Sequence, residues 1–128
     1  MKDLGIHRTI DAPFEEVIER VTKALQAEGF GILTEIDVAA TLKKKLDVDL
    51  RPYRILGACN PPLAHRALQA DLDIGLMLPC NVVVRTGDSG TEVAMFDPKG
   101  FATSTDSPAM REVAAEAGAR LRRALDAI

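Results

Sequence analysis

Two cysteines carry the most distinctive chemistry of this chain, Cys59 in the stretch GACNPP and Cys80 in the stretch LPCN. A pair of thiols can be oxidised to a disulfide, bind a soft metal ion, or fill a core as small apolar groups. A metal site needs further ligands, and the nearest candidates are His65, Asp71 and Asp73. Their spacing is not that of a zinc motif, so we predict no metal site.

The residues that follow Cys59 give a reason to expect thiol chemistry. Asn60 and then Pro61 are typical of a helix start, and the amides at a helix N-terminus stabilise a thiolate, which would lower the pKa of Cys59. The alternative is that Asn-Pro serves only the helix and that Cys59 is a buried small residue. Catalysis with His65 as the base is not favoured, because the helical spacing does not aim its ring at the sulfur.

We therefore predict a ligand or thiol site at the two cysteines, with no catalytic residue and no cofactor assigned. Its residues are Cys59, Asn60, Pro61, Pro79, Cys80 and Asn81, with His65 and Asp71 as neighbours. Asp71 has two interpretations. A continued helix would carry it onto an apolar stripe, where a carboxylate needs a partner, whereas a helix that ends there would leave it to cap a turn with Asp73.

Hydrophobic periodicity predicts the elements that position these residues. Five strands are expected over residues 4–10, 30–38, 53–59, 80–85 and 91–97. Helices are expected between Asp11 and Gly29, over 39–46, from Asn60 to about Asp71, and from Asp106 or Ser107 to the end of an apolar stripe at Leu125. Residues 72–78 read as an irregular connection and 97–100 as a turn. In the second strand, strict alternation places one set on the same face: Phe30, Ile32, Thr34, Ile36 and Val38.

This order, β-α-β-α-β-α-β-β-α, predicts a single α+β domain over residues 1–128, with the long last helix on one face of a five-stranded sheet. The Gly-Asp-Ser-Gly segment before Thr91 is typical of a hairpin, which favours an antiparallel sheet over a parallel one. If the strand ending at Cys59 pairs antiparallel with the strand beginning at Cys80, the two thiols lie near each other. The sequence does not set that register.

Composition excludes several classes of function. The chain has 128 residues, 16 basic and 19 acidic side chains and a net charge of -3, so it offers no electrostatic surface for nucleic acid. It has no apolar run long enough for a signal peptide or a membrane span. We therefore expect a cytoplasmic protein, where a permanent disulfide is disfavoured. Nucleotide-binding glycine loops and the GxSxG pattern are also absent from the sequence.

The motifs Thr34-Glu35-Ile36-Asp37, Gly57-Ala58-Cys59-Asn60-Pro61, Gly75-Leu76 and Leu78-Pro79-Cys80-Asn81, with Ala64 and Leu68 between them, resemble the domain of unknown function 302 family over nearly the whole chain. The resemblance implies a fold similar to the TATA-binding-protein-like group, with a curved antiparallel sheet and a long C-terminal helix. It also implies that the protein forms homodimers. It implies no reaction.

Three functions are consistent with these features. The first is a non-enzymatic module that binds a small ligand or a partner near Cys59 and Pro79, between the sheet and the last helix. The second is a thiol redox or metal-handling protein that uses Cys59 and Cys80. The third is a homodimeric structural or regulatory protein with no site chemistry.

Overall fold

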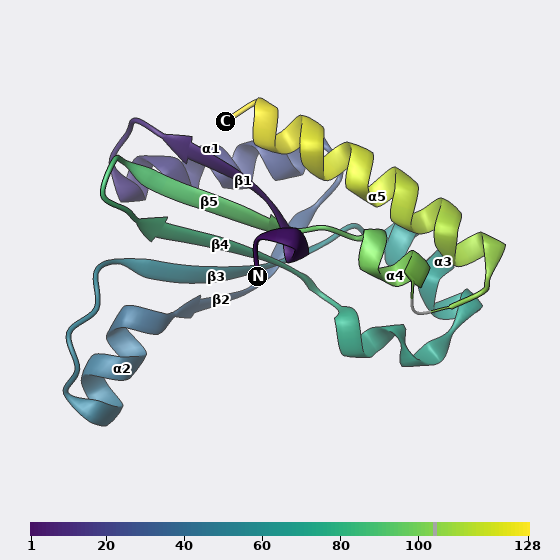
Figure 1. Ribbon diagram of the computed structural model, residues 1–128, viewed down its shortest axis with the longest axis horizontal. Coiled ribbons are helices and arrows are strands. Elements are labelled where there is room, and N and C mark those ends of the chain that lie inside the picture. Colours follow the sequence, from purple (N-terminus) through teal and green to yellow (C-terminus); the bar gives the residue numbers. More distant parts are fainter. Residues whose placement is uncertain (104) are drawn as a thin grey trace.

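The computed structural model describes residues 1–103 and 105–128 and has the predicted α+β architecture (Figure 1). The strands are β1 (Gly5–Ile10), β2 (Gly31–Asp37), β3 (Tyr53–Cys59), β4 (Cys80–Thr86) and β5 (Thr91–Phe96). The α-helices are α1 (Phe14–Ala27), α2 (Val38–Leu46), α3 (Pro61–Ala70), α4 (Lys99–Thr103) and α5 (Pro108–Asp126). Two 3-10 helices, η1 (Lys2–Leu4) and η2 (Leu72–Met77), complete the described elements.

The sheet is antiparallel throughout, with strand order β1-β5-β4-β3-β2. The hairpin predicted from the Gly-Asp-Ser-Gly segment joins β4 and β5, and Val83 lies opposite Ala94 in that pair. This confirms the predicted fold class. Among the described residues, no helix combines the length and apolar character that crossing a bilayer requires.

Helices α1 and α5 pack on one face of the sheet and form the main core there. Val82 and Val84 of β4, with Met95 of β5, are fully buried against α1 and α5. A second apolar cluster lies where α3, α4 and η2 pack on the first half of α5, and it contains Leu63, Phe101 and Cys80. The cysteine region therefore lies at the junction of the sheet with this second helical layer (Figure 1).

Side-chain caps explain why the helices begin where the sequence predicts. The backbone N–H of Leu63 donates to Oδ1 of Asn60 (3.2 Å), which starts α3, and the backbone N–H of Met110 donates to Oγ of Ser107 (3.3 Å), which starts α5. Each cap precedes a proline in the first turn. Two predicted irregular segments contain short helices, since 72–78 holds η2 and the turn at 97–100 runs into α4.

The strict alternation predicted for the second strand is wrong. The pairing of β2 with β3 shifts between Ile32 and Thr34, so Ile32 lies opposite Ala58 and Thr34 lies opposite Gly57. Neighbouring residues of β3 point to opposite faces, so Ile32 and Thr34 do too. A β-bulge at Leu33 inserts one residue and exchanges the faces of everything after it.

Candidate functional site

Asn60 holds together the two elements that meet at the cysteine region. It is 7% exposed, caps α3 through Oδ1, and donates from Nδ2 to the backbone carbonyl of Glu28 at 3.4 Å. Gly29 makes this approach possible, because a Cβ there would stand 2.8 Å from Nδ2 of Asn60 and the residue has φ +85°. Both ends of the Asn60 amide thus serve the backbone.

The two prolines of the predicted site also have structural surroundings. Pro61 is exposed in the first turn of α3. Pro79 follows a cis peptide bond, and its Cγ lies 2.8 Å from the position that a Cβ on Gly57 would occupy. Its ring therefore covers β3 at Gly57.

The remaining predicted residues do not converge on one point. Cys80 is buried at 5% exposure, whereas Asn81, the next residue of β4, is exposed on the other face of the sheet. His65 is exposed on α3. The helix ends at Ala70, and Asp71 caps η2 by accepting a hydrogen bond from the backbone N–H of Asp73 at 2.9 Å, so the turn-capping interpretation of Asp71 is confirmed.

The two cysteines are not cross-strand partners. Cys80 lies opposite Ala58, and Cys59 lies opposite Gly31 on the other side of β3. Both are free cysteines. Burial raises the pKa of Cys59, and burial together with the neighbouring Cys59 raises the pKa of Cys80 to about 11. The expected lowering of the Cys59 pKa by the helix N-terminus is therefore wrong, because burial disfavours the charged thiolate.

A cavity of about 20 Å³ adjoins both cysteines. Apolar side chains from α3, α4 and α5 form half of its wall, including Leu63, Phe101 and Val113. That volume holds about one water molecule. Among the described residues, no three His, Cys, Asp or Glu side chains gather closely enough to hold a metal ion.

A much larger hollow lies on the opposite face of the sheet, which we call the open face. Register places a row of residues across all five strands there: His7, Ala94, Val83, Ile55 and Ile36. Each member of this row is partly or fully exposed. Four members of the row are apolar, namely Ala94, Val83, Ile55 and Ile36. The solvent-exposed face of a sheet usually carries polar side chains instead.

The groove over the first part of this row has a volume of about 700 Å³. His7, Ala94 and Val83 belong to its lining, with Tyr53 and Phe96 also present. Arg85 and Glu92 lie opposite each other in β4 and β5 and form an ion pair within the lining. Asn81 is the one residue of the predicted site that lines this groove.

A family model, the domain of unknown function DUF302, matches residues 6–128. The chain belongs to the DUF302 family. A crystal structure of an uncharacterized conserved DUF302 protein from Bacillus stearothermophilus is similar to it, with a TM-score of 0.88, 34% sequence identity and 96% of each chain covered. No curated protein matched this chain. These comparisons show the family and the fold, whereas the function has to be argued from the geometry of the site.

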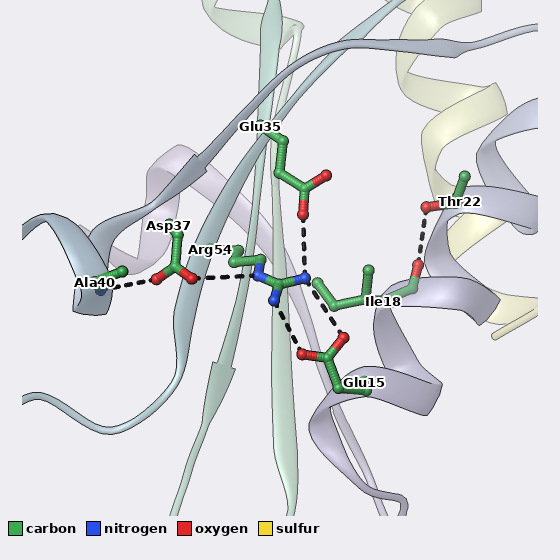
Figure 2. A network of polar contacts seen from close by, with 7 residues as sticks. All are labelled: Glu15, Ile18, Thr22, Glu35, Asp37, Ala40 and Arg54. Atoms are coloured by element: carbon green, nitrogen blue, oxygen red, sulfur yellow. Dashed lines mark hydrogen bonds and ion pairs between the residues drawn. The ribbon is translucent and has the colours of Figure 1, made fainter.

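This DUF302 chain also has a polar network that the sequence analysis missed (Figure 2). Arg54 is 23% exposed and contacts three carboxylates, those of Glu15 (2.9 Å), Glu35 (3.1 Å) and Asp37 (3.9 Å). Its guanidinium also lies 5.4 Å from the ring centre of Phe14. Because Glu15 is in the first turn of α1 and Asp37 caps α2, the network fastens two helix N-termini to β3.

The sequence analysis missed the residues that line the groove, because each of them is of a type that is common in strands. Val83 reads as one of three consecutive valines, and Ala94 as a small strand residue. The available signal was that β3 and β4 carry apolar residues on both faces, as with Ile55 beside Leu56. In a sheet with helices on one face only, that pattern marks the other face as a surface for contact.

Proposed function

We propose that this protein is a non-enzymatic binding module that holds a small molecule in the groove on its open face. The observation that carries the proposal is the groove itself, whose volume of about 700 Å³ lies within the range of small-molecule sites. The cavity at the cysteines, at about 20 Å³, is too small for such a ligand.

The construction of the groove supports this role. Its floor is made by the paired strands β1, β5 and β4, which are held from behind by the main core of α1 and α5. A floor fixed by strand pairing does not need to be ordered when a ligand arrives, and this lowers the cost of binding. Apolar contact comes from Val83 and Ala94, and hydrogen bonding is available from Asn81 and Tyr53.

Placing a charge on the floor of the groove will weaken binding of an apolar probe. Nile red, a neutral planar dye, is expected to shift its emission to shorter wavelength with the wild-type protein. Val83→Asp places a carboxylate on the floor, and we expect at least about tenfold weaker binding. Fluorescence titration measures both.

Val48→Asp is the matched control, because Val48 is 46% exposed in the connection after α2 and does not line the groove. It should bind the dye as the wild type does. A site on the open face would be contradicted if both variants lost dye affinity equally. It would also be contradicted if Val83→Asp kept the wild-type affinity for the dye and an intact circular dichroism spectrum.

A homodimer is the second candidate, and the exposed apolar residues beyond the groove favour it. Ile36 ends the row at 50% exposure, Leu33 in the bulge is 67% exposed, and Leu46 of α2 is 66% exposed. Helix α2 has no buried residue and projects from the sheet (Figure 1). Large exposed apolar side chains of this kind are typical of a surface that another molecule covers.

Sedimentation will test this second candidate. If the open face is the dimer contact, we expect the wild type to sediment as a dimer and Ile36→Lys to sediment as a monomer. A charge cannot be buried in that contact without a partner. Leu72→Lys, at an 81% exposed position in η2, is the control and should sediment as the wild type does. A wild-type protein that stays monomeric at about 100 μM, a concentration at which a dimer of micromolar affinity is nearly complete, would exclude the candidate.

The thiol hypothesis receives less support. Redox exchange and metal binding require a thiolate, and the pKa values of Cys59 and Cys80 are both raised. We therefore do not propose a redox or metal-handling function. Two free cysteines fit a reducing compartment, so a cytoplasmic location remains part of the proposal.

A further inference from the structure

We infer, resting on the proposed function, that the groove on the open face accepts an apolar carboxylate, a molecule with one anionic end and an apolar body. Three features of the groove support this class of ligand. They are the net charge of its lining, the hydrogen-bond donors of Arg85 that the protein does not use, and the apolar floor beside them.

The side chains that line the groove carry more positive than negative charge. Of the described lining residues, Arg8 and Arg85 are cationic and Glu92 is the one acid. Arg8 donates from Nη1 to the carbonyls of Leu125 (2.8 Å) and Ile128 (2.9 Å) at the end of α5. The carbonyls at a helix C-terminus carry only about half a negative charge, so Arg8 keeps part of its positive charge. The lining therefore attracts an anion and repels a cation.

Arg85 has guanidinium donors beside the groove that its ion pair leaves unused. Its side chain is 44% exposed, and the ion pair with Glu92 of β5 engages Nη2. A guanidinium has five N–H donors, and within the described part of the chain no ion pair engages the others of Arg85. Tyr53 lies opposite Arg85 on the other side, in β3, and its hydroxyl adds a neutral donor. A carboxylate between Arg85 and Tyr53 can accept from both.

Arg54 shows that a guanidinium of this sheet can hold more than one carboxylate. On the face that α1 covers, it contacts Glu15 at 2.9 Å and Glu35 at 3.1 Å (Figure 2). The fork of N–H donors allows this, because one carboxylate occupies only part of it. Arg85 has the same chemistry on the open face, and Glu92 is its one carboxylate partner among the described residues. A second carboxylate at Arg85 is therefore compatible with the existing pair.

The apolar floor lies directly beside these donors. Val83 and Ala94 stand opposite each other, two residues along their strands from Arg85 and Glu92. Residues two apart in a strand point to the same face and lie roughly 6–7 Å from each other. A body attached one or two bonds from a carboxylate thus reaches the floor while the anion stays at Arg85. A carboxylate without such a body would gain only a half-exposed ion pair, which stabilises little.

Three compounds that share one ring and differ in charge test the ligand class: indole, indole-3-acetate and tryptamine. Each is titrated into the wild-type protein and followed by saturation-transfer NMR. Indole-3-acetate is expected to bind about fivefold more tightly than indole and at least about tenfold more tightly than tryptamine. Indole or tryptamine binding as tightly as indole-3-acetate, or more tightly, would overturn the carboxylate class.

Glu92→Gln tests the position of the carboxylate, because it removes the acid that competes for Arg85. We expect indole-3-acetate to bind about fivefold more tightly than it does to the wild type, and indole to bind as before. Glu16→Gln makes the same change in an ion pair with Arg20 on α1, across the sheet, and should alter neither. Loss of fold cannot produce a gain in affinity. No gain in Glu92→Gln, or an equal gain in Glu16→Gln, would overturn the carboxylate position at Arg85.

Failure of the ligand class and failure of the proposed function give different results. Val83→Asp marks the groove, since Val83 lies on its floor. Indole binding that Val83→Asp weakens, with no preference for indole-3-acetate in the wild type, would overturn the carboxylate class and leave the groove as the site. Indole binding that Val83→Asp leaves unchanged, or no binding by any of the three compounds, would overturn both.

Discussion

Cys80 in the folded protein is expected to react with Ellman's reagent at neutral pH about 100-fold more slowly than a thiol of ordinary pKa. Its pKa is raised from 9.0 to about 11, and the thiolate that attacks the reagent is scarcer by the same factor. The side chain is also buried, which slows access further. Stopped-flow absorbance on Cys59→Ser, which retains Cys80 alone, measures the rate.

The same burial makes stability depend on pH at the alkaline end. The folded pKa of Cys80 lies above the unfolded value, so its contribution is fully present below pH 9 and is lost as the pH rises to about 11. The free energy of unfolding should fall by about 2–3 kcal/mol across this window. Urea denaturation at pH 8 and pH 11 measures the loss, which Cys80→Ala should reduce.

Unfolding in guanidinium supplies the control for reactivity, since Cys80 should then react as fast as Cys59 does in unfolded protein. If folded Cys59→Ser protein reacted with Ellman's reagent as fast as a free thiol does, this would contradict the structural role of Cys80. It would restore the thiol hypothesis, because only a stabilised thiolate gives such a rate.

Gly57→Ala is expected to destabilise the fold by about 2–3 kcal/mol. A Cβ on Gly57 would stand 2.8 Å from Cγ of Pro79 and closer still to Oγ1 of Thr34, so the chain must shift on both sides of β3. Thr34→Ala in the same chain removes one of the two contacts and should recover about half of the loss. Urea denaturation of the single and double variants gives these differences.

Gly31→Ala provides the matched control in the same sheet. Gly31 pairs opposite Cys59 in β2, and a Cβ there meets no atom within 4 Å. Its free energy of unfolding should stay within about 0.5 kcal/mol of the wild type. Equal effects at Gly57 and Gly31 would show that loss of chain flexibility, and not packing under Pro79, governs these positions.

The fold could be predicted because its local signals agree with one another. Asn60 and Ser107 cap helices with a proline following each, and the glycines around Asp88 set a hairpin. These signals act within a few residues, so a reading along the chain detects them. The bulge at Leu33 has no such signal, because it depends on how β2 fits against β3.

The candidate site could be predicted less well, because register decides it. One residue of register sets Cys80 opposite Ala58 and not opposite Cys59, and this settles the relation of the two thiols. The groove depends on the same information, since His7 and Val83 meet through β5 although 76 positions separate their numbers in the sequence. Burial raises the pKa of Cys59, which the helix start was expected to lower.

The most direct test of the open-face site is a two-dimensional amide NMR spectrum of the wild-type protein titrated with indole. The largest shifts are expected for the amides of His7, Val83 and Ala94, on the three strands that form the groove floor. Shifts centred on Cys59 and Leu63 would place the ligand at the small cavity and contradict the proposed function. No change at either place at millimolar indole would contradict it as well.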